Sequence, residues 1–139
     1  MEKETINHLI DTAIHQLKYS YTPYSNFKVG AALLARNGQV YTGCNIENAG
    51  YTATNCAERT AFFKAVSEGV KDFQAICVVG GKAGVLTEYA APCGVCRQVM
   101  AEFCDPKAFR VLMARTETDY RECSLEEVLP FGFTKEELQ

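Results

Sequence analysis

The sequence predicts an α/β fold in which a mixed five-stranded sheet is covered by helices on both faces. Helical and strand-like stretches alternate along the chain, and such an order implies three layers, α/β/α. The chain has 139 residues, enough for one hydrophobic core, so we expect a single domain over residues 1–139. The last two strand-like stretches are joined only by residues 115–118, which are too few for a parallel crossover. The final strand is therefore expected to be antiparallel.

The first part of the chain is expected to form a helix followed by a hairpin. Residues 5–19 carry apolar side chains at the spacing of an amphipathic helix, and Pro23 prevents its continuation. Residues 27–35 and 39–44 are strand-like. The Asn-Gly pair at 37–38 between them is the strongest short signal for a hairpin.

The middle of the chain is expected to contain a second helix and a central strand. Residues 56–68 have helical character and are followed by Gly69, a residue typical of helix C-termini. Residues 73–79 form a continuous apolar run, as expected for a strand that is buried on both faces. The two glycines at 80–81 are expected to form a turn after this strand.

The last part of the chain is expected to add two helices and two strands. Residues 93–103 are the third predicted helix, and strands are expected at 109–114 and 119–123. Ser124 is expected to cap a brief helix that runs through Leu129.

The composition excludes several classes of function. The net charge is −3 and no basic stripe is present, so we expect no nucleic-acid partner. No apolar stretch could cross a bilayer, and residues 1–16 do not resemble a signal peptide, so we expect no membrane partner and a cytoplasmic (cytosolic) location. The seven cysteines are odd in number and irregularly spaced, which argues against a disulfide framework. Four of them have apolar neighbours and are expected in the core: Cys44, Cys77, Cys104 and Cys123.

The other three cysteines stand in two motifs that predict a catalytic metal site. Cys56 is followed two residues later by Glu58, and Cys93 is followed three residues later by Cys96. Three protein ligands are one fewer than a closed structural zinc site uses, so a fourth position stays open for water. Glu58 is badly placed to bind the same ion but well placed to move a proton of that water. The pattern predicts one zinc ion and hydrolysis, and it is typical of zinc nucleobase deaminases.

Helix termini and one arginine are expected to tune this site. Cys56 and Cys93 stand at predicted helix starts, where backbone N–H groups and the helix dipole favour the thiolate. Three thiolates outnumber the two positive charges of Zn²⁺ and would weaken its effect on water. Arg59 is therefore expected to donate hydrogen bonds to Cys56, with Cys93 as a second candidate partner. A redox pair or a zinc knuckle would also explain Cys93 and Cys96, but not Cys56 and Glu58.

Beyond these motifs, the chain resembles the small homotetrameric cytidine deaminases over about residues 23–133. The likeness includes residues 24–32, 43–48, 56–61 and 93–98. The resemblance implies a cytidine deaminase-like fold, one zinc ion per subunit and a homotetramer. It also implies that cytidine and 2′-deoxycytidine are converted to uridine and 2′-deoxyuridine with release of ammonia, a reaction of pyrimidine salvage.

The resemblance also implies how the nucleoside binds. Phe27 would stack on the pyrimidine ring, whereas its alternative role is that of a core residue at a strand start. Asn45 and Glu47 alternate at a predicted strand end, and both would bind the ribose 3′-hydroxyl. The alternative role of Asn45 and Glu47 is that of two polar surface residues that bind no substrate. Because cytidine and 2′-deoxycytidine share this hydroxyl, both are expected substrates.

Further contacts are implied by the same resemblance. Tyr51 matches a tyrosine on the sugar side of the site. The carbonyl of Ala57 and the N–H of Cys93 would orient the substrate amino group and the attacking oxygen. Phe133 matches a phenylalanine that reaches into the site of a neighbouring subunit, although a C-terminal core aromatic is the alternative. Each site would then be complete only in the tetramer.

In the expected reaction, Glu58 takes a proton from zinc-bound water, and the resulting hydroxide attacks C4 of the cytosine ring. Glu58 then passes the proton to N3 and helps ammonia leave. Two alternatives stay open. The substrate could be another base, a nucleotide, a tRNA adenosine or a nucleoside antibiotic of the blasticidin type. The protein could instead be a catalytically silent zinc-binding module, for which Glu58 would have no use.

Overall fold

The computed structural model describes all 139 residues and contains one mixed sheet of five strands. Three short 3₁₀ segments lie at Gln16–Tyr19, Tyr51–Ala53 and Lys135–Leu138. The helices and strands follow in the order α1 (Lys3–His15), β1 (Phe27–Ala35), β2 (Val40–Cys44), α2 (Ala57–Ser67), β3 (Phe73–Lys82), α3 (Gly94–Phe103), β4 (Arg110–Thr116), β5 (Asp119–Ser124) and α4 (Leu125–Val128).

The strands lie in the order β2-β1-β3-β4-β5. Only β3 and β4 are parallel, and the chain between them contains α3, as a parallel crossover requires. The pairs β1–β2, β1–β3 and β4–β5 are antiparallel. The predicted hairpin is present, with Gly38 at a φ of +91° in its turn. The prediction of an antiparallel last strand is also confirmed.

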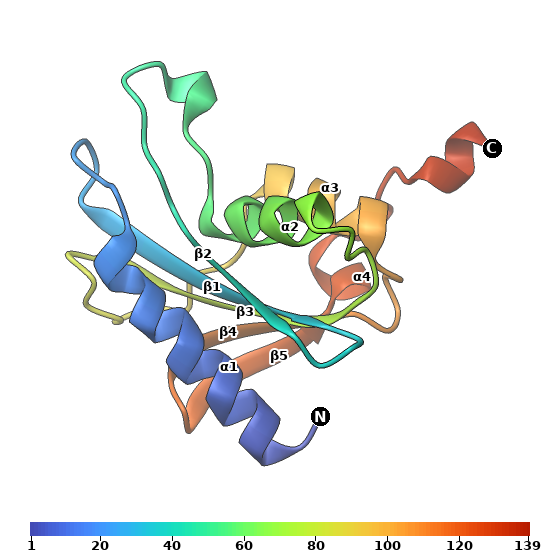
Figure 1. Ribbon diagram of the computed structural model, residues 1–139, viewed down its shortest axis with the longest axis horizontal. Helices are drawn as coiled ribbons and strands as arrows, with labels where there is room; N and C mark the ends of the chain where they lie inside the picture. The colour runs from blue at the N-terminus through green and yellow to red at the C-terminus, as the bar shows by residue number, and fades with distance from the viewer.

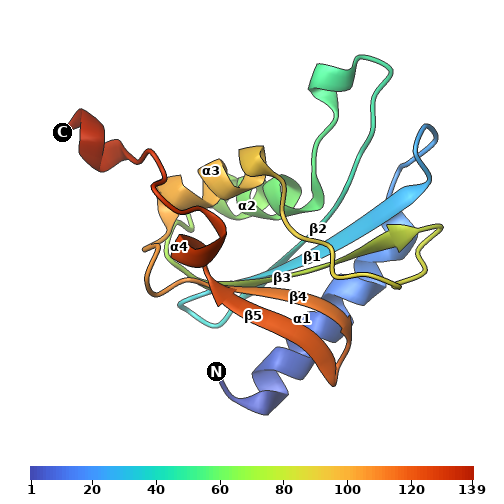
Figure 2. The same cartoon turned by 180° about the vertical axis from the view of Figure 1, so that it is seen from behind.

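Helices cover both faces of the sheet (Figure 1 and Figure 2), which confirms the predicted three layers. One core lies between the sheet and α1, and a larger one lies between the sheet and the helices α2, α3 and α4. The side chains of β3 alternate between these cores because successive residues of a strand point to opposite faces. Ala75, Cys77 and Val79 join the core under α1, while Ile76 and Val78 join the other.

All seven cysteines are free thiols. Of the four expected in the core, Cys77 and Cys104 lie in the two cores and Cys44 is buried. Cys123 is only half-buried and packs against the core from its edge. None of these four belongs to the cluster of cysteines described below.

The central strand β3 is longer than its apolar run, so the expected turn at the two glycines is wrong. Gly80 and Gly81 still pair with β1, and the chain turns only at Ala83 and Gly84, which have φ of +54° and +80°. A Cβ atom on Gly81 would lie 1.9 Å from the carbonyl oxygen of Val85. Glycine is required there because the following loop passes close to the strand.

Two helix ends follow the local signals in the sequence. Gly69 has a φ of +87° two residues after the end of α2, and the N–H of Val70 donates to the carbonyl of Ala65 over 3.0 Å. Ser124 caps α4 as predicted, in a reciprocal pair of hydrogen bonds with Glu127.

Two segments project from the layered body, residues 46–55 and residues 129–139 (Figure 1). The first carries Tyr51, which is 84% exposed, and the second carries the fully exposed Phe131. No helix of the chain has both the length and the apolar character that crossing a membrane requires.

Candidate functional site

Three thiols converge at the N-terminal ends of α2 and α3. Cys56 immediately precedes α2, Cys93 immediately precedes α3, and Cys96 lies in the first turn of α3. Their sulfur atoms all lie within 4.8 Å of one another, and 3.6 Å separates the Sγ atoms of Cys56 and Cys93. Two motifs that are distant in the sequence therefore meet at one point.

The spacing of these sulfur atoms fits a zinc ion. Zn–S bonds of about 2.3 Å in a tetrahedral arrangement place the sulfur atoms about 3.8 Å apart. The 3.6 Å between Cys56 and Cys93 is close to this value. Cys96 is buried and Cys93 is exposed, so the cluster opens to solvent on one side. The chain supplies three ligands and leaves one tetrahedral position for a small molecule.

The thiols differ in how readily they ionise. The pKa of Cys56 is lowered to about 5, chiefly because its sulfur accepts a hydrogen bond from Cys96 and also because Arg59 donates to it. The pKa of Cys96 is raised because this thiol is the donor in that pair and because it is buried. Of this pair, Cys56 therefore becomes a thiolate first.

Arg59 lies beside the thiols, in the first turn of α2. Its Nη2 donates a hydrogen bond to Sγ of Cys56 over 3.3 Å, so the expected contact is present. No hydrogen bond joins Arg59 to Cys93, the second candidate partner. Arg59 is half-buried, and its Nε is buried without a hydrogen-bond partner.

Glu58 is a buried carboxyl group beside the same cluster, with 3% of its surface exposed. Burial raises the pKa of Glu58 to about 7, and the negative charge of Cys56 adds to this rise. A hydrogen bond from its own backbone N–H and the charge of Arg59 act in the opposite direction. A carboxyl group with a pKa near neutrality can both accept and release protons at physiological pH.

Glu58, Cys56 and Cys93 line one pocket of about 410 Å³. Ala57 lies in the wall of this pocket. Phe27 also lines the pocket, and 42% of the surface of Phe27 is exposed. The alternative of a core role for Phe27 is therefore wrong. An apolar pocket that contains a few converging polar groups is the usual form of a small-molecule site.

Asn45 also lines this pocket. It was expected at the end of a strand, but β2 ends at Cys44 and Asn45 is the first residue after it. Its side chain accepts a hydrogen bond from the N–H of Val29 over 3.0 Å and donates one to the carbonyl of Phe27 over 2.7 Å. Asn45 therefore holds the start of β1, which carries Phe27, in place. One N–H of its amide group remains free for a ligand.

Glu47 holds the loop before β1. Its carboxylate accepts hydrogen bonds from the N–H groups of Tyr24 and Ser25, over 3.0 and 3.1 Å, and from the hydroxyl of Ser25. The hydrogen bond from the Ser25 hydroxyl is the main reason why the pKa of Glu47 is lowered. Glu47 does not line the pocket of the single chain, whereas Asn45 does. An ionised carboxylate can accept about four hydrogen bonds, so one position remains.

Tyr51 and Phe133 lie outside this pocket. They belong to the two projecting segments, and 84% of Tyr51 and 58% of Phe133 are exposed. The carbonyl of Phe133 accepts a hydrogen bond from Gln98 over 2.7 Å. The single chain does not bring either aromatic side chain to its own thiol cluster.

Several residues of the pocket wall are not predicted by the sequence. Val29, Thr54, Asn55 and the run at 89–91 complete the lining. Val29 had no local signal, whereas the other residues lead into Cys56 or into Pro92-Cys93 and must pass close to any metal bound there. Tyr89 is the one large side chain in that run.

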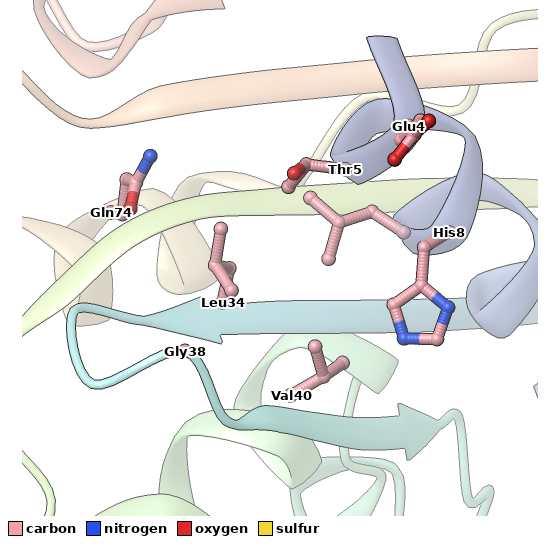
Figure 3. A pocket seen from close by; sticks show the side chains of 8 residues that line it. Glu4, Thr5, His8, Leu34, Gly38, Val40 and Gln74 are labelled. Carbon is pink, nitrogen blue, oxygen red and sulfur yellow. The ribbon is translucent and has the colours of Figure 1, made fainter. Parts of the chain in front are cut away.

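A second hollow lies between α1 and the β1–β2 hairpin, on the face of the sheet that α1 covers (Figure 3). Glu4 and His8 of α1 line it, opposite Leu34 and Val40 of the hairpin. Glu4 and His8 are its only ionisable side chains, and they do not belong to a cluster of three potential metal ligands. The pocket beside the thiols is therefore the better candidate for chemistry.

Similar sequences point to one kind of enzyme. Residues 3–113 match the model of a protein family described as the cytidine and deoxycytidylate deaminase zinc-binding region. The chain is 52% identical over 119 residues to a cytidine deaminase of Sporosarcina psychrophila, covering 86% of this chain and 84% of the relative. It is 49% identical over 130 residues to a cytidine deaminase of Halalkalibacterium halodurans, covering 94% and 95% of the two chains.

Similar solved structures agree with the sequence comparison. The 1.6 Å crystal structure of cytidine deaminase from Burkholderia pseudomallei has a TM-score of 0.82 and 45% identity, covering 91% of this chain and 97% of that chain. Cytidine deaminase from Mycobacterium tuberculosis has a TM-score of 0.78 and 35% identity, covering 91% and 95%. The likeness confirms the predicted fold class.

Proposed function

The chain belongs to the cytidine and deoxycytidylate deaminase family, and we propose that it is a zinc-dependent hydrolase that deaminates cytidine and 2′-deoxycytidine. Water replaces the amino group at C4, so the products are ammonia and uridine or 2′-deoxyuridine. The observation that carries the proposal is the convergence of three thiols beside a pocket that contains the buried carboxyl group of Glu58.

Cys56, Cys93 and Cys96 would hold the zinc ion in this scheme. When bound there, zinc lowers the pKa of a water molecule to about 7 and so supplies a nucleophile near neutral pH. Arg59 is proposed to offset the charge of the third thiolate through its hydrogen bond to Cys56.

Glu58 is proposed to carry the protons of the reaction. It accepts a proton from the attacking water, delivers it to N3 of the pyrimidine ring, and then helps to protonate the departing amino group. Its pKa of about 7, raised by burial, supports transfer in both directions at neutral pH. The carbonyl of Ala57 is proposed to accept a hydrogen bond from the substrate amino group, and the N–H of Cys93 to orient the attacking oxygen.

The sugar and the base are proposed to bind on the other side of the pocket. The ring of Phe27 stacks on the pyrimidine, and its partial exposure at the pocket edge supports this role. Asn45 and Glu47 bind the ribose 3′-hydroxyl with the hydrogen-bonding capacity that their contacts within the chain leave unused. Tyr51 is proposed to approach the sugar as well.

We further propose that the protein works as a homotetramer in the cytosol, where it serves pyrimidine salvage on free nucleosides. Phe133 is proposed to complete the site of a neighbouring subunit, which its exposure and its position outside its own pocket support. The net charge of −3 favours an uncharged nucleoside over nucleic acid. The single continuous sheet supports one domain over residues 1–139.

An ultraviolet assay tests the proposed reaction. The protein should convert cytidine and 2′-deoxycytidine with release of ammonia, and a chelator should abolish turnover. Glu58→Gln should keep one zinc ion per chain but lose about 10³-fold in kcat, because proton transfer by a positioned side chain contributes up to about 10⁴-fold. Glu68→Gln, at the other end of α2, is the matched control and should keep full activity.

The same experiment separates the alternatives. Stoichiometric zinc without turnover would indicate a catalytically silent module, and turnover of a nucleoside antibiotic but not of cytidine would indicate a different substrate. Full turnover by Glu58→Gln would contradict the proposed proton carrier. Size-exclusion chromatography with light scattering tests the homotetramer.

A further inference from the structure

The loop between β3 and α3, residues 83–93, forms one wall of the pocket but has little backbone structure of its own. It returns across the sheet from the end of β3 to the start of α3 (Figure 2). Tyr89, Ala90 and Ala91 line the pocket, and Cys93 ends the loop at the thiol cluster. From residue 88 to residue 93, no backbone N–H donates to a backbone carbonyl group. Side chains must therefore hold this wall.

Tyr89 joins the loop to the hairpin formed by β4 and β5. Its hydroxyl donates a hydrogen bond to Oδ1 of Asp119, and the guanidinium carbons of Arg115 and Arg121 lie 4.8 and 4.5 Å from the centre of its ring. Both distances are within the range of cation–π contacts. Arg115 also donates to Oδ2 of Asp119 over 2.8 Å and to the carbonyl of Thr87 over 2.9 Å. We call Tyr89, Arg115, Asp119 and Arg121 the tyrosine clamp.

The metal end of the loop is held by different contacts. Nε of Arg97 donates to the carbonyl of Pro92 over 2.7 Å, and its Nη1 donates to the carbonyl of Val128 over 2.6 Å. The N–H of Arg97 donates to the carbonyl of Cys93 over 3.0 Å. Cys93 is therefore positioned by α3, independently of the tyrosine clamp.

We propose that Asp119 and Arg115 are positioning residues that hold the pocket wall through Tyr89 and thereby set the affinity for the nucleoside. The proposal rests on the proposed function. Without the clamp, the wall must be ordered each time a nucleoside binds, which weakens binding. Cys93 and Glu58 are held by α3 and α2, so the chemical step keeps its geometry. Loss of the clamp should therefore raise KM and leave kcat and the zinc content unchanged.

Asp119→Ala tests the proposal, with Glu122→Ala as its matched control. Glu122 forms an ion pair with Arg110 over 2.8 Å on the same hairpin. The side chains of Arg110 and Glu122 are 33% and 29% exposed. Those of Arg115 and Asp119 are similarly exposed, at 35% and 36%. Asp119→Ala should raise the KM for cytidine about tenfold, because Tyr89 and Arg115 both lose their hydrogen-bond partner, and change kcat by less than about twofold. Glu122→Ala should change neither constant.

Two further measurements complete the test. Tyr89→Phe keeps the ring between the arginines but loses the hydroxyl, so its KM should rise by a smaller factor of about three. A glutamyl endopeptidase cuts after glutamate, and Glu88 of the loop is exposed. Cleavage of the native protein at Glu88 is a measurement that does not depend on turnover of cytidine. Its rate should rise about tenfold in Asp119→Ala, because cleavage follows the population of the opened loop, and not in Glu122→Ala.

An unchanged KM in Asp119→Ala would overturn the clamp as the determinant of affinity, and so would a fall in kcat and zinc content. If the unaltered protein leaves cytidine intact, the proposed function fails instead. In that case cleavage at Glu88 is the remaining test of the clamp. Equal cleavage rates in Asp119→Ala and Glu122→Ala would show that the clamp does not hold the loop.

Discussion

Gly43 of β2 lies directly against the start of α2, and replacing it with alanine should damage the metal site. A Cβ atom there would lie 2.2 Å from the carbonyl oxygen of Ala57 and 2.7 Å from the N atom of Ala61. Real Cβ atoms keep at least 3.0 Å from such neighbours, so α2 must retreat by about 0.8 Å or more. Cys56 and Glu58 stand at that end of α2 and move with it.

Gly30→Ala is the matched control for Gly43→Ala. A Cβ atom on Gly30 of β1 would lie 2.1 Å from the carbonyl oxygen of Ala13 in α1, on the opposite face of the sheet. Both changes overpack a core, and each should lower the free energy of unfolding by about 1–3 kcal/mol. A displacement of about 1 Å at the reacting groups can lower the rate about 100-fold. We expect that loss in kcat/KM for Gly43→Ala only.

Urea unfolding measures the free energy of unfolding of both variants, and the ultraviolet assay measures kcat/KM well below the unfolding midpoint. Zinc content is measured on the same samples. If Gly43→Ala and Gly30→Ala lose activity equally, displacement of α2 is not what limits the site. Full kcat/KM in a folded Gly43→Ala protein would refute the displacement itself.

Three further changes probe the site and its scaffold. Arg59→Ala should lower kcat about tenfold or more, because a hydrogen bond to the charged sulfur of Cys56 is lost, and full turnover with an unchanged pH profile would contradict its proposed role. Cys93→Ala should lose zinc while Cys123→Ala keeps it, measured by atomic absorption; equal zinc contents would exclude Cys93 as a ligand. Ser124→Ala removes the cap of α4 and should lower the free energy of unfolding by about 1 kcal/mol without changing kcat/KM. A change in kcat/KM would show that α4 contributes to the site.

Local signals in the sequence predicted most elements of the fold. The Asn-Gly pair of the first hairpin, Gly69 after α2 and Ser124 before α4 all act within a few residues of their own position. The wrong prediction concerned Gly80 and Gly81. A glycine pair looks the same in a turn and in a strand, and only pairing with β1 and the close passage of the next loop distinguish the two cases.

The sequence by itself determined the chemistry of the site: three thiols, one carboxyl group and one arginine, with Cys56 and Cys93 at helix starts. These properties depend on residue type and on local helix signals, so neighbouring residues suffice to predict them. The tertiary structure alone decided that the sulfur atoms meet within 4.8 Å, that Glu58 is buried beside them, and that Tyr89 is anchored to the start of β5. These contacts join residues far apart in the chain, and they exist only because the sheet and its two helical layers pack in one particular way.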